Sequence, residues 1–213
     1  SIFNPNESGL RVPLELALAV HTDAGQTPNK VHGTLGVVMT SHNDGRVAEG
    51  ASRLTSHDMA QIVMGQVYDD IQSLYGKWSM RQLWDRNYSE CRLPQVPSMI
   101  LEMLSHQSLA DMQYMHDPTF KFTLARAIYK GVLRYLSRMH GNLSPIVQPL
   151  PITRLAAQTK ASKQEIRVTW QPTRDALEPT ATPTGYVVYV RRDGNDFDNG
   201  IYTSVPELVI TTE

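Results

Sequence analysis

The chain has 213 residues, a formal net charge of −1 and 41% hydrophobic residues, which is enough material for one or two domains with buried cores. Its lysines and arginines form no cluster, which argues against a nucleic-acid or anionic-membrane surface, and no apolar run approaches the ~20 residues that span a bilayer. The single cysteine, Cys91, excludes an intrachain disulfide. The first residues have neither an initiator Met nor the layout of a signal peptide, so we expect a piece of a longer protein.

The first half of the chain predicts an α/β unit. Residues 14–20 form an apolar run with the length of a strand buried on both faces of a parallel sheet. Residues 33–40, rich in glycine and β-branched side chains, predict a neighbouring strand. Apolar residues then recur at helical spacing over residues 52–75, where Thr55 and Asp58 predict a capping box.

The middle of the chain is less regular. Residues 79–97 predict an irregular segment with one short strand at residues 89–93. The apolar stretch at residues 98–104 predicts another strand, which is interrupted by Glu102. Because burying an unpaired carboxylate is costly, we expect Glu102 to be paired, bound to a metal, or at the exposed end of the strand.

A second long helix is expected from residue 117 onward. Asp117 and Pro118 fit the N-cap and the first helical position. The apolar residues from Phe122 to Met139 then form a stripe at helical spacing, and Gly141 marks the expected end.

The composition changes in a proline-rich connector at residues 144–151. Beyond it, alternating polar and apolar residues replace the helical period. We therefore predict two domains, residues 1–145 as an α/β unit and residues 146–213 as a partial β-sandwich, which is short of the roughly 100 residues of a complete one. The expected strands of the second domain lie within residues 165–172, 185–194 and 206–213.

His21 and Glu102 are the strongest candidates for chemistry. Each lies at or near the carboxyl end of a predicted strand, which is where open α/β sheets assemble their sites. Neutral imidazole is a common zinc ligand, and a nearby carboxylate serves as a ligand or as the base for a metal-bound water. The alternatives are that His21 is a hydrogen-bonded residue at a strand end and that Glu102 is the structural partner of an arginine such as Arg92.

Asp23 and His106 are weaker candidates beside this pair. Asp23 lies two residues after His21, where it either orients the imidazole or stabilises the turn that follows. His106 follows Glu102 by four residues and could reach the same cleft. With Arg92, they form a set of candidate supporting or substrate-contacting residues.

Three stretches resemble the zinc-dependent N-acetylmuramoyl-L-alanine amidases of the amidase 3 family. LALAVHTDAG is similar to the strand and histidine motif of that family, VPSMILEMLSHQS to its later glutamate motif, and ARAIYKGVLRYL to its closing helix. The resemblance covers roughly residues 10–140. The residues after 146 resemble the first part of a fibronectin type III domain, with Trp170 as its core tryptophan. Secreted bacterial proteins loosely labelled xanthan lyase combine two such units.

The resemblance implies a partly parallel sheet flanked by helices and zinc-dependent hydrolysis of an amide bond in peptidoglycan. His21 matches a zinc histidine and Glu102 the catalytic glutamate. The family's other two zinc ligands precede the strand expected at residue 14, so we expect this chain to hold its one zinc ion weakly or not at all. The stretch after Glu102 also lacks the family's glycine, which leaves the shape of the cleft open.

The resemblance further implies a secreted or periplasmic protein whose partner is peptidoglycan or another cell-wall glycan, with neither a nucleic-acid partner nor a membrane span. Two other functions remain open. One is a polysaccharide-active lyase, which needs a cluster of residues that abstracts a proton next to a uronate carboxylate. Only Tyr88 and Arg92 approach such a cluster in the sequence. The other is a non-catalytic module that binds the cell wall.

Overall fold

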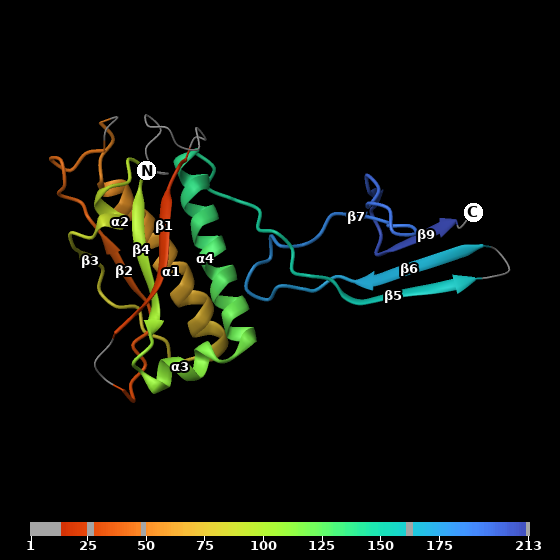
Figure 1. The fold of residues 1–213 in the computed structure, drawn as a ribbon, viewed down its shortest axis with the longest axis horizontal. Coiled ribbons are helices and arrows are strands. Elements are labelled where there is room, and N and C mark those ends of the chain that lie inside the picture. The colour runs from red at the N-terminus through yellow and green to blue at the C-terminus, as the bar shows by residue number, and fades with distance from the viewer. Residues whose placement is uncertain (1–13, 25–27, 48–49, 161–163, 212–213) are drawn as a thin grey trace. The chain divides into compact units, whose positions relative to one another are not determined.

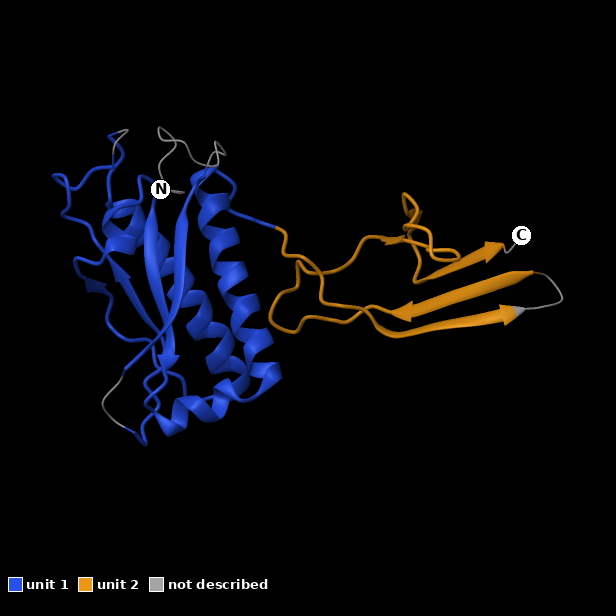
Figure 2. Ribbon diagram, in the orientation of Figure 1, with its two compact units in different colours: residues 1–145 blue, residues 146–213 orange. Residues whose placement is uncertain are grey.

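The computed structural model describes residues 14–24, 28–47, 50–160 and 164–211 (Figure 1). The chain divides into two compact units, Ser1–Pro145 and Ile146–Glu213, shown in different colours in Figure 2. None of the helices in the described part of the chain has the length and apolar character needed to cross a membrane.

The first unit is built on a four-stranded sheet with the order β1-β4-β2-β3. Strand β1 (Ala17–Asp23) runs parallel to β4 (Ser98–Ser105), and β2 (Leu35–Val38) runs antiparallel to β4 and parallel to β3 (Trp84–Asp85). The predicted class, a partly parallel sheet with helices packed against it, is therefore confirmed.

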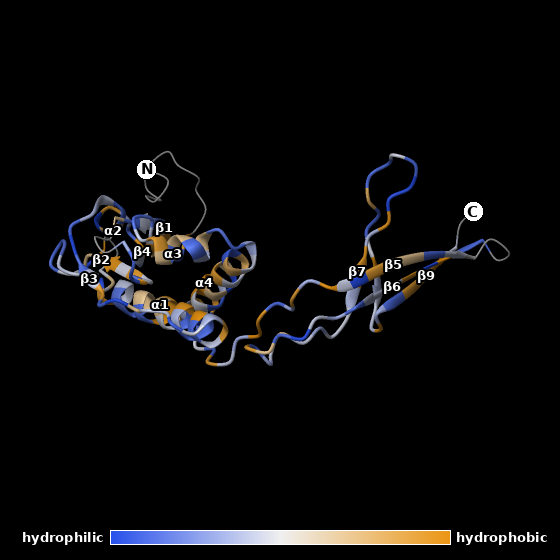
Figure 3. Ribbon diagram, turned by 90° about the horizontal axis from the view of Figure 1, so that it is seen from below, coloured by the Kyte–Doolittle hydropathy of each residue, from blue (hydrophilic) through white to orange (hydrophobic). Residues whose placement is uncertain are grey.

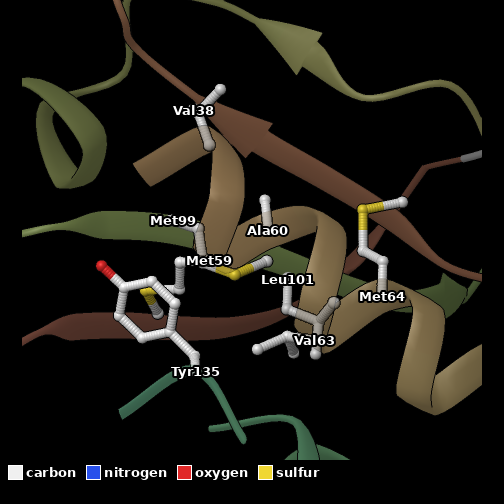
Figure 4. Close-up of a cluster of buried hydrophobic side chains, with 8 residues drawn as sticks. All are labelled: Val38, Met59, Ala60, Val63, Met64, Met99, Leu101 and Tyr135. Carbon is white, nitrogen blue, oxygen red and sulfur yellow. The ribbon is translucent and has the colours of Figure 1, made fainter. Parts of the chain in front are cut away.

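Two long helices, α1 (Leu54–Tyr75) and α4 (Pro118–Met139), pack with one face of this sheet. Both helices carry hydrophobic and hydrophilic positions (Figure 3). The apolar side chains on one side of each helix join the core, as in an amphipathic helix. Side chains from α1, α4, β2 and β4 form the main core cluster (Figure 4), which comprises Val38, Met59, Ala60, Val63, Met64, Met99, Leu101 and Tyr135.

The opposite face of the sheet is covered by the short helix α2 (Ser89–Arg92). Successive residues of a strand point to opposite faces, so Leu101 joins the cluster with α1 while Ile100 joins a smaller cluster with Cys91 of α2. By the same alternation, Glu102 lies on the α2 face of the sheet.

The strands differ from the prediction in extent and order. β1 begins and ends three residues later than expected, so His21 lies within it, and most of its residues are only partly buried because it is an edge strand of this sheet. β2 is not its neighbour, since β4 pairs between them. β4 also continues through Glu102 to Ser105, whereas an interruption was expected.

The capping box predicted for α1 is wrong. The N-cap residue is Arg53, which makes no side-chain cap, and the Thr55 hydroxyl donates instead to the Ser52 carbonyl (2.7 Å). The Arg53 side chain is fully buried and fastens the start of α1 to two other segments. Its guanidinium donates to the backbone carbonyls of Arg46, Cys91 and Arg92.

The strand predicted at residues 89–93 is also wrong, because this stretch forms α2. The backbone N–H groups of Cys91 and Arg92 both donate to the Tyr88 carbonyl (3.1 and 2.9 Å). Tertiary anchoring of these few residues, through the buried Cys91 and the Arg53 guanidinium, stabilises a helical turn that the local sequence did not indicate.

The start predicted for α4 is confirmed. The Asp117 carboxylate accepts from the Thr119 N–H (2.8 Å), and proline follows at the first helical position. The seven-residue helix α3 (Leu109–Met115) was not predicted. Its N-cap is Ser108, whose hydroxyl accepts from the Asp111 N–H (3.3 Å).

In the second unit, the three-stranded antiparallel sheet has the order β5-β6-β9, formed by Thr153–Lys160, Glu165–Gln171 and Glu207–Thr211. A hairpin pairs β7 (Tyr186–Val188) with β8 (Ile201–Thr203). Each stretch predicted to hold a strand contains one, whereas β5 and β8 were not predicted. Trp170 is buried, and its ring packs edge-on against that of Tyr186 with centroids 5.1 Å apart.

The crossing of α1 and α4 depends on a glycine. A Cβ added at Gly131 of α4 would lie 2.8 Å from the backbone Cα of Val63, whereas a Cβ at Gly65 of α1 would meet nothing within 4 Å. We expect Gly131→Ala to lower the free energy of unfolding by about 1–3 kcal/mol through overpacking. Gly65→Ala should raise it by up to about 1 kcal/mol, since alanine is the better helix former. Urea unfolding of the two variants checks this prediction, and equal stabilisation by both would contradict it.

Candidate active site

The candidate site lies on the α2 face of the sheet, where β1 and β4 run side by side. His21 and Glu102 are direct partners in the parallel register of these strands, so their side chains share this face. The structure thus brings together the two residues that the sequence analysis ranked highest.

A second carboxylate, which the sequence analysis did not single out, contacts the imidazole. His21 Nε2 lies 2.9 Å from Glu90 Oε1, and both side chains are about two-fifths exposed, at 41% and 42%. Glu90 belongs to α2, the element whose structure was predicted wrongly, and it lies 69 positions from His21 in the sequence. No local pattern could have indicated this contact.

Glu102 has the electrostatic character of a proton carrier. Burial raises the pKa of its carboxyl above the ordinary value; the charges of Asp23 and Glu90 raise it further, while His21 and Arg81 oppose the shift. Its Oε2 is buried and has no hydrogen-bond partner among the described residues. A carboxylate with a raised pKa and an unengaged oxygen is suited to accepting and returning a proton.

Asp23 contacts an arginine and not His21. The register of β1 with β4 shifts between His21 and Asp23, and such an irregularity redirects the side chains that follow it. The Asp23 carboxylate pairs with the guanidinium of Arg81, a residue that the sequence analysis did not select. Asp23 therefore has a charged partner beside the site, but this partner is Arg81 and not His21.

Arg92 and His106 lie near the site without contacting Glu102. Arg92 is part of α2 and does not pair with Glu102, so the alternative that made these two residues structural partners is wrong. The exposed His106 ring lies against β1, with Nδ1 3.2 Å from the Thr22 carbonyl oxygen and 3.2 Å from its hydroxyl. Their role as supporting or substrate-contacting residues stays a prediction.

The end of β4 is fixed by Asp111, another residue that was not predicted to matter. Its fully buried carboxylate accepts from three backbone N–H groups, those of Ser105 (2.8 Å), His32 (2.9 Å) and Gly33 (3.3 Å). The loop before β2 and the residues directly after Glu102 are therefore fastened to one point, which holds the site on a rigid frame.

The described residues do not make a zinc site by themselves. In the part of the chain that the structure describes, no group of three or more His, Cys, Asp or Glu side chains could hold a metal ion. Zinc sites in proteins use three or four protein ligands. The His21 and Glu90 pair with Glu102 nearby thus does not fit a tightly held zinc ion.

Comparison with known proteins places this unit in a family. The family model described as N-acetylmuramoyl-L-alanine amidase, amidase 3, matches residues 10–134. The chain belongs to this family. Its amidase domain therefore comes from a family of peptidoglycan hydrolases that is typically zinc-dependent. No curated protein matches the chain.

Solved amidase structures are similar to the chain at low identity. An N-acetylmuramoyl-L-alanine amidase from Clostridium difficile 630 is 20% identical with a TM-score of 0.47, covering 58% of each chain. The N-acetylmuramyl-L-alanine amidase from Mycobacterium smegmatis is also 20% identical with a TM-score of 0.47, over 58% of this chain and 55% of that one. The CwlD amidase from Clostridioides difficile, solved with the GerS lipoprotein, is 15% identical with a TM-score of 0.48, over 64% and 59%. The chain thus spans less than two thirds of these structures.

Proposed function

We propose that the amidase domain hydrolyses the amide bond between the lactyl group of muramic acid and L-alanine in peptidoglycan. The observation that carries this proposal is Glu102, whose unengaged and partly buried carboxylate lies opposite His21 in a domain of the amidase 3 family. Among the carboxyls that the structure describes in the first unit, Glu102 combines a raised pKa with a buried oxygen that has no hydrogen-bond partner.

The chemistry assigned to Glu102 is general acid and base catalysis. Its carboxylate takes a proton from the attacking water while the water oxygen bonds to the amide carbon. As the C–N bond breaks, Glu102 returns that proton to the leaving amine of L-alanine. Proton transfer by a positioned side chain contributes typically 10²–10⁴-fold to the rate. The His21 imidazole, which contacts Glu90 (2.9 Å), lies on the same face of the sheet as this carboxylate.

The proposal assigns no reaction step to the zinc ion expected from the family. His21 is the residue of this chain that would contact it, but the described residues supply no three-ligand group. The steps above are therefore assigned to Glu102 and its neighbours alone.

The second unit is proposed to be a partial fibronectin type III-like module that accompanies the enzyme at the cell wall, in a secreted or periplasmic protein. Two features support this: the antiparallel sheet β5-β6-β9, and the buried Trp170, which packs on Tyr186.

The test is digestion of purified peptidoglycan by the full chain, in buffer with and without added zinc chloride. We expect peptides with a new L-alanine amino terminus and glycan strands that keep the lactyl group. An unsaturated uronate absorbance from an acidic polysaccharide would instead favour the lyase. Retention on the wall without any product would favour a binding module, and either result would overturn the proposal.

The activity should fall at low pH earlier than for an ordinary carboxylate. Glu102 must be ionised to accept a proton, and burial raises its pKa above the ordinary value of 4.5. The rate should therefore decrease as the pH falls through a pKa above 4.5, whereas the fold should persist. A kcat/KM profile between pH 4 and 8, with circular dichroism at each pH, checks this. A flat profile down to pH 4.5 would contradict it.

A further inference from the structure

Arg81 belongs to no motif of the sequence, yet its backbone is fastened to the start of the sheet. Its N–H donates to the Thr34 carbonyl (2.9 Å), and the Thr34 N–H donates to the Ser79 carbonyl (2.9 Å). Thr34 directly precedes β2. The backbone of Arg81 is therefore held in place beside the start of β2.

The side chain of Arg81 joins the two strands that flank β4. Its Nη1 donates to the Asp23 carboxylate at the end of β1, and its Nη2 donates to the Gly33 carbonyl before β2 (3.3 Å). Because β4 lies between β1 and β2, the guanidinium links the ends of both neighbours of the strand that carries Glu102. A planar fork of donors suits this double contact, whereas an ammonium is a point charge.

The end of β1 needs such a link. In the described sheet, β1 is an edge strand held by β4 alone, and its register shifts between His21 and Asp23. Beyond the shift, the strand is held by the Asp23 carboxylate and by its carbonyl, which accepts from the His106 N–H (3.0 Å). The Arg81 and Asp23 side chains are only 21% and 17% exposed, so solvent screens their attraction less than that of a surface pair.

We propose that Arg81 is a positioning residue for the proposed amide hydrolysis. By donating to both the Asp23 carboxylate and the Gly33 carbonyl, it fixes the end of β1 and so the placement of His21 beside Glu102. This inference rests on the proposed function. Arg81 does not need to touch the substrate, because a displacement of about 1 Å at a reacting group is enough to lower a rate by about 10²-fold.

The kinetic test compares Arg81→Met, Arg81→Lys and Arg86→Met in the full chain on peptidoglycan. We expect Arg81→Met to lower kcat by about 10–100-fold with KM changed less than about threefold, as a loss of positioning predicts. Arg81→Lys should recover part of kcat, since it keeps the charge but not the fork. Arg86 is exposed, lies over the Trp84 ring and serves as the matched control, so its variant should keep the wild-type kcat.

A second measurement separates this inference from the proposed function. Amide hydrogen exchange at His106, which donates to Asp23, should speed up at least tenfold in both Arg81 variants, while exchange at Gly76 at the end of α1 stays unchanged. If the wild-type chain shows no hydrolysis, the proposed function fails and the exchange result alone decides the role of Arg81. If the Arg81→Met variant does not fold, the exchange rate and kcat of the Arg81→Lys variant are used instead. Wild-type exchange at His106 in the folded variant would overturn the inference, and so would an unchanged kcat in an active enzyme.

Discussion

Glu102→Gln should lower kcat for amide hydrolysis by about 10²–10⁴-fold, the usual contribution of a general base. Glutamine has nearly the same shape but accepts no proton from water. Burial already disfavours the ionised form of Glu102, so the neutral amide should not lower the free energy of unfolding. The loss is therefore expected in the chemical step and not in the fold.

The matched control for this variant is Glu15→Gln. Glu15 is an exposed carboxylate that pairs with His140 (2.9 Å), and its loss should leave kcat unchanged. Both variants are assayed by the rate of appearance of L-alanine amino termini, with thermal unfolding measured in parallel. If Glu102→Gln keeps the wild-type rate, Glu102 has no part in the reaction.

Asp70→Ala should strongly destabilise the amidase domain. The Asp70 carboxylate, on α1, lies 2.8 Å from the Lys130 ammonium of α4 and accepts from the Gln66 amide (2.9 Å). The side chains of Lys130 and Asp70 are only 1% and 7% exposed. Removing one partner of a buried ion pair costs about 3–5 kcal/mol, so urea unfolding should show a decrease of that size.

Asp69→Ala is the matched control for this loss, because Asp69 directly precedes Asp70 in α1 and is exposed. Its effect should stay within about 0.5 kcal/mol. A double variant, Asp70→Leu with Lys130→Met, should recover much of the loss, since apolar replacement of a buried pair is often neutral or stabilising. Equal effects of Asp69→Ala and Asp70→Ala would show that the buried pair does not hold α1 to α4.

The pairing of His21 with Glu102 at the candidate site agrees with the ranking of these two residues from the sequence. His21 and Glu102 stand out because each interrupts an apolar strand with a group that is costly to bury, and such groups persist where they are used or paired. The helix α4 was predictable, because Asp117 and Pro118 act through contacts within one turn.

Arg81 and Glu90 were not predictable, because their roles depend on partners far away in the sequence. Arg81 reaches Asp23 across the ends of three strands, and Glu90 reaches His21 from a helical turn held in place by the buried Arg53. The order of the strands was missed for a related reason. Nothing within residues 33–40 indicates that β4, some 60 positions later, inserts between β2 and β1.

The most direct test of the central claim is hydrolysis of peptidoglycan in water enriched in oxygen-18, followed by mass spectrometry of the muramic acid product. An amidase acting at this bond adds one oxygen atom from water to the lactyl carboxylate and none to the released peptide. We predict a lactyl carboxylate heavier by one oxygen-18, formed by the wild-type chain and lost with Glu102→Gln. A product without the label, or the same labelling rate in both proteins, would contradict the account.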